Sequence, residues 1–181
     1  GQARQFEIVR IAKEHGIRLV GPNCMGVINA QNGMALSVAA IFEMPELMSG
    51  RFGVISQSGT ILGALISRGA ARGIGFSKLV SVGNESDLSV GEVLDLMIDD
   101  DGTDAILLFL EGIRNAESIA EAAVRAHKKK KPILAYKLGK SEAGRELAVS
   151  HSGALASPGR TTDAYFKRHG IIGVDMLETL F

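Results

Sequence analysis

The 181-residue sequence has one cysteine, no tryptophan and no excess of either charge. With Cys24 alone the chain cannot form an internal disulfide, which is typical of proteins in a reducing compartment. The 20 lysines and arginines balance the 20 aspartates and glutamates, so no basic field predicts binding to nucleic acid or to a membrane surface. No apolar run reaches the roughly 18 residues of a transmembrane helix, and the N-terminus lacks the apolar core of a signal peptide. We therefore expect a cytoplasmic protein without nucleic-acid or membrane partners.

Glycine is abundant instead, with 22 residues, and many stand where an apolar stretch ends. Short apolar stretches alternate with amphipathic ones, which indicates strands followed by helices. The predicted strands are 17–20, 52–56, 76–82, 105–110, 132–137 and 171–174. The predicted helices are 3–15, 60–72, 89–98, 116–128, 141–147 and 161–169, with a helical tail at 176–181. This alternation predicts a parallel sheet of five core strands with helices on both faces.

The start of the chain does not fit this alternation. The first helix and strand form an αβ unit without a sheet of its own, so we expect residues 1–30 to be the C-terminal remnant of another domain. Residues 31–49 are weakly patterned and contain Pro45, which predicts a connector. The main domain is then expected over residues 50–181.

A turn of small polar residues joins the predicted strand at 52–56 to the following helix, and its members are Ser56, Gln57, Ser58, Gly59 and Thr60. Hydroxyl groups, a glycine and the free amides of a helix start suit an anion, above all a phosphoryl group. An ordinary helix N-cap with a tight turn explains the same residues equally well. No Gly-Lys-Ser/Thr follows at the spacing of a P-loop, so a P-loop nucleotide site is not predicted.

Glu111 follows five apolar residues at the carboxyl end of the predicted strand 105–110. Ligands of parallel sheets bind beyond the carboxyl ends of the strands, so we expect Ser56, Glu111 and Gly139 along one edge of the sheet, with the pocket at that edge. A carboxylate there can hold one ring nitrogen of a histidine so that the other nitrogen acts as a nucleophile. Pairing with Arg114, or capping of the next helix, is the structural alternative for Glu111.

His151 stands in a stretch of small residues that includes Ser152 and Gly153. Small neighbours let a ligand come close to a side chain. The other three histidines each lie near the end of a predicted helix, where the helix dipole explains them: His15, His127 and His169. Because His151 has no such explanation, we predict that it is the reactive group.

Four motifs follow one another along the chain: Gly21-Pro22-Asn23-Cys24-Met25-Gly26, Gly53-Val54-Ile55-Ser56-Gln57-Ser58-Gly59, Lys137-Leu138-Gly139-Lys140-Ser141-Glu142-Ala143-Gly144 and Ser150-His151-Ser152-Gly153-Ala154-Leu155-Ala156. Their residues, order and spacing resemble the α-subunit side of the NDP-forming acyl-CoA synthetases, the superfamily of succinyl-CoA synthetase and ADP-forming acetyl-CoA synthetase. The last motif is the most specific, and the resemblance extends over nearly the whole chain.

The resemblance implies a flavodoxin-like three-layer α/β/α fold with a parallel sheet for residues 50–181. It identifies residues 1–30 with the end of the family's CoA-binding Rossmann-like domain. It also implies that His151 is phosphorylated during turnover and that Glu111 orients the phosphohistidine. The reaction would then be acid, CoA and ATP giving acyl-CoA, ADP and phosphate, by way of an acyl phosphate.

The remaining site residues also follow from the resemblance. The turn from Ser56 to Thr60 corresponds to the helix start that receives the phosphoryl group, and Ser152 and Gly153 would bind phosphate with it. The pocket for CoA or acyl phosphate would include Asn23, Gly83 and Asn84. No metal site is implied in this domain.

Partners follow in the same way. CoA and a carboxylic acid would be substrates. ATP or ADP with Mg²⁺ would be bound by an ATP-grasp domain or β-type subunit, which has no counterpart in this sequence. We therefore expect the chain to be inactive alone and to work in a larger, oligomeric enzyme.

Two other functions stay open at this point. Related domains serve as CoA- or acyl-CoA-sensing regulatory parts of protein acetyltransferases, where no turnover is needed. A simple flavodoxin-like binding module is the third possibility. Retention of both His151 and Glu111 favours an enzyme.

Overall fold

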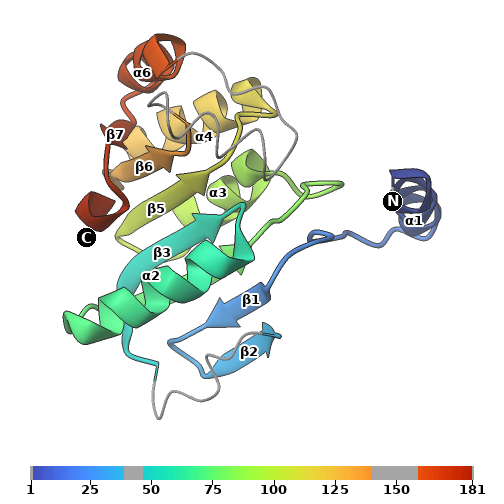
Figure 1. Ribbon diagram of the computed structural model, residues 1–181, viewed down its shortest axis with the longest axis horizontal. Coiled ribbons are helices and arrows are strands. Elements are labelled where there is room, and N and C mark those ends of the chain that lie inside the picture. Colours follow the sequence, from blue (N-terminus) through green and yellow to red (C-terminus); the bar gives the residue numbers. More distant parts are fainter. Residues whose placement is uncertain (1, 39–46, 140–158, 181) are drawn as a thin grey trace.

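The computed structural model describes residues 2–38, 47–139 and 159–180 (Figure 1). Its helices are α1 (Gln2–Glu14), α2 (Gly59–Ala71), α3 (Val90–Ile98), α4 (Ala116–Lys128), α6 (Gly159–Arg168) and the 3-10 helix η2 (Leu177–Leu180). Its strands are β1 (Gly26–Asn29), β2 (Met34–Ser37), β3 (Ser49–Ser56), β4 (Phe76–Ser81), β5 (Ala105–Leu110), β6 (Ile133–Lys137) and β7 (Ile172–Val174). The predicted helix at 141–147 lies outside the described residues. Within them, no helix is long and apolar enough to cross a membrane.

All seven strands belong to one sheet, in the order β2-β1-β4-β3-β5-β6-β7. The five strands from β4 to β7 run parallel, and β1 and β2 extend the sheet in antiparallel pairs. The predicted parallel sheet of five core strands is therefore confirmed. Every residue of the central strand β5 is buried, because helices cover both of its faces, and its sequence is accordingly a continuous apolar run.

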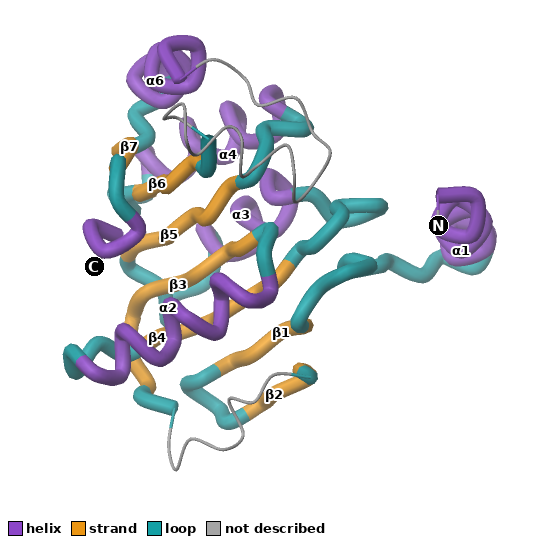
Figure 2. Tube along the Cα trace, viewed as in Figure 1, coloured by secondary structure: helices purple, strands orange, loops and turns teal. Residues whose placement is uncertain are grey.

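Helices cover both faces of the parallel strands and give three layers (Figure 2). On one face, α3, α4 and Phe166 of α6 pack against Ile106 and Leu108 of β5. On the other face, α2 and η2 pack against Val54 and Leu107. Successive residues of β5 thus serve opposite cores, as the two-residue period of a strand requires. The expected three-layer α/β/α arrangement is confirmed.

The predicted strand at 17–20 is wrong, because this stretch does not join the sheet. The backbone N–H of Leu19 donates to the Asp87 carboxylate at 2.7 Å, and the N–H of Leu88 donates to the Leu19 carbonyl at 3.1 Å. An aspartate side chain thus supplies half of the pairing that a neighbouring strand would provide. The apolar pattern of the stretch indicated burial but did not reveal this partner.

The stretch 31–49, which we expected to be a connector, contains strand β2 and the first residue of β3. Strand β2 forms a hairpin with β1 through a turn in which Gly33 has a φ of 73° and Asn32 Oδ1 accepts the Met34 N–H at 3.0 Å. It is a four-residue edge strand that alternates between exposed and half-buried positions. An alternation of exposed and half-buried residues over only four positions does not identify a strand from sequence. The division into domains stays a prediction.

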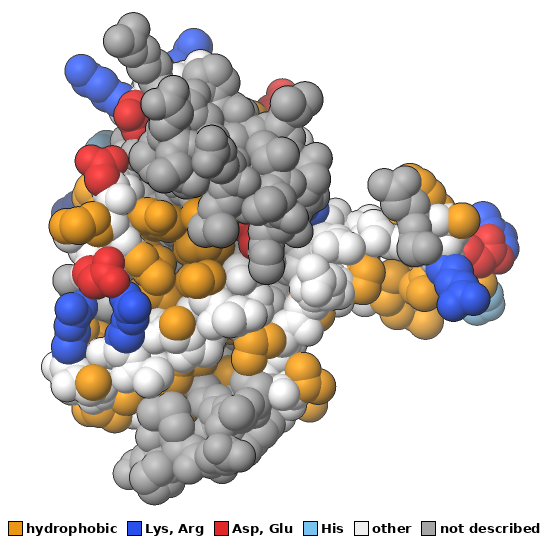
Figure 3. Space-filling view, viewed as in Figure 1, with side chains coloured by type: hydrophobic (Ala, Val, Ile, Leu, Met, Phe, Trp, Pro, Cys, Tyr) orange, Lys and Arg blue, Asp and Glu red, His pale blue; other side chains and the backbone are white. Residues whose placement is uncertain are grey.

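Helix α1 lies apart from the sheet at the end of the segment that leads to β1 (Figure 1). Hydrophobic side chains are exposed on it, among them Phe6 and Ile8 at 71% and 57% (Figure 3). Its Gln5 Oε1 accepts a hydrogen bond from Asn84 Nδ2 at 3.1 Å. The loop that follows β4 therefore contacts both α1 and the edge of the sheet.

Candidate functional site

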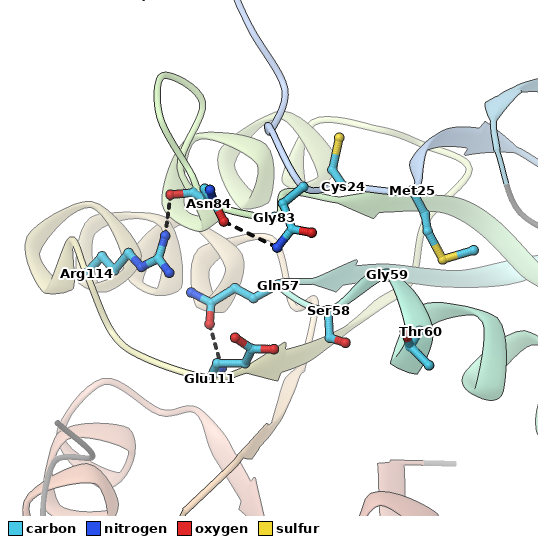
Figure 4. Close-up of a pocket in the computed structure, with 11 residues that line it drawn as sticks. Cys24, Met25, Gln57, Ser58, Gly59, Thr60, Gly83, Asn84, Glu111 and Arg114 are labelled. Carbon is cyan, nitrogen blue, oxygen red and sulfur yellow. Dashed lines mark hydrogen bonds between the residues drawn. The ribbon is translucent and has the colours of Figure 1, made fainter. Parts of the chain in front are cut away.

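A pocket of about 420 Å³ opens at the edge where the parallel strands end (Figure 4). The register places Ser56 beside Phe109, while Glu111 follows the end of β5 and Gly139 lies two residues beyond the end of β6. The predicted common edge is therefore confirmed. The lining comes from residues 23–25, 57–60 and 83–84, and from Glu111 and Arg114.

The start of helix α2 forms one wall of this pocket. Ser58 is its N-cap, and the Ser58 hydroxyl accepts the Ile61 N–H at 3.4 Å. The Gly59 and Thr60 amides belong to the first turn and have no partner within the helix, so they can bind an anion. Ser56 is fully buried beneath them, where its hydroxyl donates to the Ser58 carbonyl at 2.6 Å. Capping and anion binding are thus compatible here.

A second wall joins two segments that are distant in the sequence. Gly83 has a φ of 56°, and a Cβ on it would lie 2.3 Å from the carbonyl oxygens of Pro22 and Asn23. The Asn84 N–H donates to the Pro22 carbonyl at 2.9 Å, and Asn23 Nδ2 donates to Asn84 Oδ1 at 3.4 Å. The structure therefore brings together Asn23, Gly83 and Asn84, the three residues expected to bind CoA or acyl phosphate.

Glu111 enters the same pocket from the end of β5 (Figure 4). Neither structural alternative holds among the described residues. Arg114 donates to the Asn84 carbonyl and lies 3.9 Å from Glu85, with no ion pair to Glu111. The cap of α4 is Asn115, whose side chain accepts the Ser118 N–H at 3.2 Å. The Glu111 carboxylate is therefore available to a ligand or to another side chain.

Gln57 was expected to bind phosphate, and the structure gives its side chain other partners. Its Oε1 accepts the Gly112 N–H at 2.9 Å and also accepts the Glu111 N–H. Its Nε2 donates to the Gly112 carbonyl at 2.8 Å and to the Glu85 carboxylate. The side chain thus holds the turn after β5, while its phosphate role stays a prediction.

Two buried charged residues beside the site were given no role in the sequence analysis. Lys137 at the end of β6 is 2% exposed, and its ammonium group donates to the Leu138 carbonyl at 2.6 Å. Burial lowers the pKa of Lys137, and the Glu111 carboxylate opposes that shift. The Glu85 side chain is 3% exposed. A lysine inside a predicted buried strand was a usable signal, whereas nothing near Glu85 in the sequence indicated burial.

His151, Ser152 and Gly153 lie outside the described residues. The described chain leaves the pocket edge at Gly139, whose φ is 84°, and resumes at residue 159. No group of three or more potential metal ligands occurs in the described parts. What these parts offer is helix amides, side-chain amides and one arginine around a carboxylate, which suits a phosphorylated ligand.

Comparisons with known proteins agree with this arrangement. The family model of the succinyl-CoA ligase-like flavodoxin domain matches residues 49–181. Acetate–CoA ligase [ADP-forming] I of Archaeoglobus fulgidus is 35% identical over 181 residues, which are 100% of this chain and 26% of that protein. Subunit α of acetate–CoA ligase [ADP-forming] II of Pyrococcus furiosus is 33% identical over 180 residues, covering 99% of this chain and 38% of that subunit.

A solved structure is similar as well. It is the dinucleotide-forming acetyl-coenzyme A synthetase 1 of Ca. Korarchaeum cryptofilum in complex with phosphate and ADP, with a TM-score of 0.87 and 33% identity. The match covers 96% of this chain and 37% of that one, so the chain spans well under half of these relatives. Because the family model covers most of the chain and the flavodoxin-like fold agrees, the chain belongs to the succinyl-CoA ligase-like flavodoxin domain family.

Proposed function

We propose that this domain is the phosphohistidine-carrying part of an NDP-forming acyl-CoA synthetase. The observation that supports this most is that the Glu111 carboxylate and the start of helix α2 line the same pocket. The carboxylate would bind the histidine ring, and the helix start would bind its phosphoryl group. Relatives named as ADP-forming ligases of acetate and of 4-hydroxybutyrate support the reaction class. Their names differ in the acid, and we propose only a carboxylic acid as substrate here.

In the proposed reaction the lone pair of one His151 ring nitrogen attacks the γ-phosphorus of ATP. The bond between that phosphorus and the β,γ-bridging oxygen breaks, and ADP leaves with the electron pair. A carboxylate oxygen of the acid then takes the phosphoryl group from the ring and becomes an acyl phosphate. The CoA thiolate finally attacks the acyl carbon and releases phosphate, which forms the thioester.

The residues of the chain would have distinct roles in these steps. Glu111 would accept the N–H of the second ring nitrogen, so that the attacking nitrogen carries its lone pair and the charged ring is stabilised. The amides of Gly59 and Thr60 would bind the phosphoryl oxygens where charge develops. Ser152 and Gly153 would bind phosphate beside the histidine. Asn23, Gly83 and Asn84 would line the place for CoA or acyl phosphate.

Other parts of the enzyme lie outside this chain in our proposal. An ATP-grasp domain or subunit would bind ATP and Mg²⁺, and the full enzyme would be an oligomer in the cytoplasm. The contribution of this domain is then to position the phosphoryl group that is transferred.

The test is phosphorylation of His151 in the full-length parent protein, or in this chain combined with its ATP-grasp partner. With γ-labelled ATP and Mg²⁺ we expect label that is lost in mild acid and survives alkali, as a phosphoramidate does and a serine ester does not. His151→Asn should abolish the label, and His169→Asn, at a helix end, should retain it. Label and acyl-CoA formation in His151→Asn would refute the proposal. An unlabelled wild type that binds acyl-CoA would favour a regulatory domain.

A further inference from the structure

Gln57 is 4% exposed, although its side chain has four hydrogen-bonding positions to satisfy. Two backbone N–H groups donate to its Oε1, from Glu111 at 2.5 Å and from Gly112 at 2.9 Å. Its Nε2 donates to the Gly112 carbonyl at 2.8 Å and to the Glu85 carboxylate at 2.5 Å. All four positions are used within the protein, so this side chain connects two parts of the fold.

The amide of Gln57 continues the sheet beyond its last backbone pair. Strands β3 and β5 pair in parallel as far as Ser56 and Phe109, and the Gln57 N–H still donates to the Phe109 carbonyl at 3.1 Å. Beyond this bond, the side-chain amide of Gln57 pairs with the backbone of Glu111 and Gly112, as a peptide group of a longer strand would. The position of the Glu111 backbone therefore depends on a side chain of the neighbouring strand end.

Glu85 fixes the other side of that amide. Its side chain is 3% exposed, and its second oxygen accepts the Val90 N–H at the start of α3 at 2.8 Å. Arg114 Nε lies 3.9 Å from the oxygen that faces Gln57. Glu85 also has a φ of 53°, which a non-glycine residue keeps only where its surroundings hold it. A buried carboxylate so placed is stable only with these partners.

We propose that Gln57 and Glu85 are positioning residues that hold the turn after β5, so that the Glu111 carboxylate meets the reacting histidine at the right place. This inference rests on the proposed function. It assigns to Gln57 an action through Glu111 in place of a direct contact with phosphate. Because phosphoryl transfer depends on positioning, a small displacement of Glu111 should slow it by a large factor.

The first test exchanges the two side chains in the complete enzyme. Gln57→Glu keeps both acceptors for the backbone N–H groups, removes both donors and sets a carboxylate against Glu85. We expect single-turnover phosphoryl transfer to fall by about 10- to 100-fold without a matching rise in the KM for ATP. Adding Glu85→Gln lets the new amide at position 85 donate to the new carboxylate at position 57, and the double variant should recover most of the lost rate.

The pH profile separates positioning from a general loss of structure. Two adjacent carboxylates can share one proton, and the shared proton restores a hydrogen bond between them. The rate of Gln57→Glu relative to wild type should therefore rise as the pH falls. The double variant should not show this rise.

Gln31 provides a matched control at the opposite end of the strands. Its Nε2 donates to the carbonyls of Gly50 and Gly102, at 3.1 and 2.8 Å, and its Oε1 accepts from Lys78. Gln31→Glu should leave the phosphoryl-transfer rate within about twofold of wild type. A wild-type rate in folded Gln57→Glu, or a double variant as slow as the single one, would overturn the proposal.

Amide hydrogen exchange in the same enzyme then separates this inference from the proposed function. The Glu111 and Gly112 amides should be protected in the wild type and in Gln31→Glu. They should exchange at least about tenfold faster in Gln57→Glu, because repulsion from Glu85 moves the new carboxylate away from them. If the wild type carries no acid-labile label, the proposed function fails, and faster exchange in Gln57→Glu still supports the hold on the turn. Unprotected Glu111 and Gly112 amides in the wild type would overturn the inference, whatever the label shows.

Discussion

Gly83 packs so closely on Asn23 that a Cβ added to the glycine would lie 2.3 Å from the asparagine carbonyl oxygen. The two residues come from distant segments that form one wall of the pocket, and each has a positive φ of 56°. This contact holds the segment before β1 against the loop after β4. It follows that the shape of the pocket depends on the absence of a side chain at position 83.

Gly83→Ala should therefore destabilise the fold and disturb the pocket. The added methyl group meets backbone oxygens that cannot move aside, and the positive φ adds strain, so we expect a loss of roughly 2 kcal/mol or more in the free energy of unfolding. Urea denaturation monitored by circular dichroism measures this. Gly112→Ala is the matched control, because no atom of the described residues lies within 4 Å of a Cβ there, and its change should be small. Equal stabilities of the two variants would contradict the packing argument.

Glu111→Gln should leave the fold intact and slow the proposed phosphoryl transfer. A neutral amide stabilises charge on the histidine ring less well, and we expect the rate of His151 labelling to fall by about 10- to 100-fold. Rapid-quench labelling of the complete enzyme measures the rate, and Glu121→Gln on the exposed side of α4 serves as the control. A labelling rate equal to wild type would remove Glu111 from the mechanism.

Asp87 should make stability depend on pH. Its carboxylate lies 3.0 Å from Arg18 Nε and accepts the Leu19 N–H, and the hydrogen bond from Arg18 lowers the pKa of Asp87. A carboxyl group with a lowered folded pKa stabilises the fold above its unfolded pKa of about 3.9, and that contribution is lost as the pH falls through the folded value. Stability should therefore fall on acidification below about pH 4.

Asp87→Asn should remove this part of the acid dependence and cost roughly 1–3 kcal/mol near neutral pH, because a charged hydrogen-bond acceptor is lost. Chemical denaturation at a series of pH values measures both effects. Asp101→Asn is the control, because the Asp101 carboxylate makes no ion pair in the described part of the chain. If Asp87→Asn kept the full acid dependence, other carboxyl groups would be responsible for it.

The chain alone should neither hydrolyse ATP nor form acyl-CoA. In the proposed function ATP is bound by a separate ATP-grasp part, and this chain supplies the acceptor histidine and its pocket. Release of ADP and formation of a thioester can be followed for the purified chain, and then after its partner is added. Turnover by the chain without a partner would show that a nucleotide site of its own had been overlooked.

Several elements could be predicted from local pattern with good accuracy. The expected bounds of β5, at 105–110, and of α4, at 116–128, are those of the structure. The apolar run of β5 and the amphipathic repeat of α4 report which faces are buried, and burial of those faces is what stabilises them. Strand ends in a parallel sheet share one edge, so the grouping of Ser56, Glu111 and Gly139 followed from order alone.

Contacts between distant residues were not predictable in this way. Gln57 bonds to Glu85, 28 positions away, and to the Glu111 N–H, 54 positions away, and no local pattern identifies such partners. The same applies to Leu19, which a predicted strand should have placed in the sheet and which the Asp87 carboxylate holds outside it. Periodicity records which side of an element avoids water. The partners of a buried polar group depend on the order and register of the strands, which arise only when the whole sheet assembles.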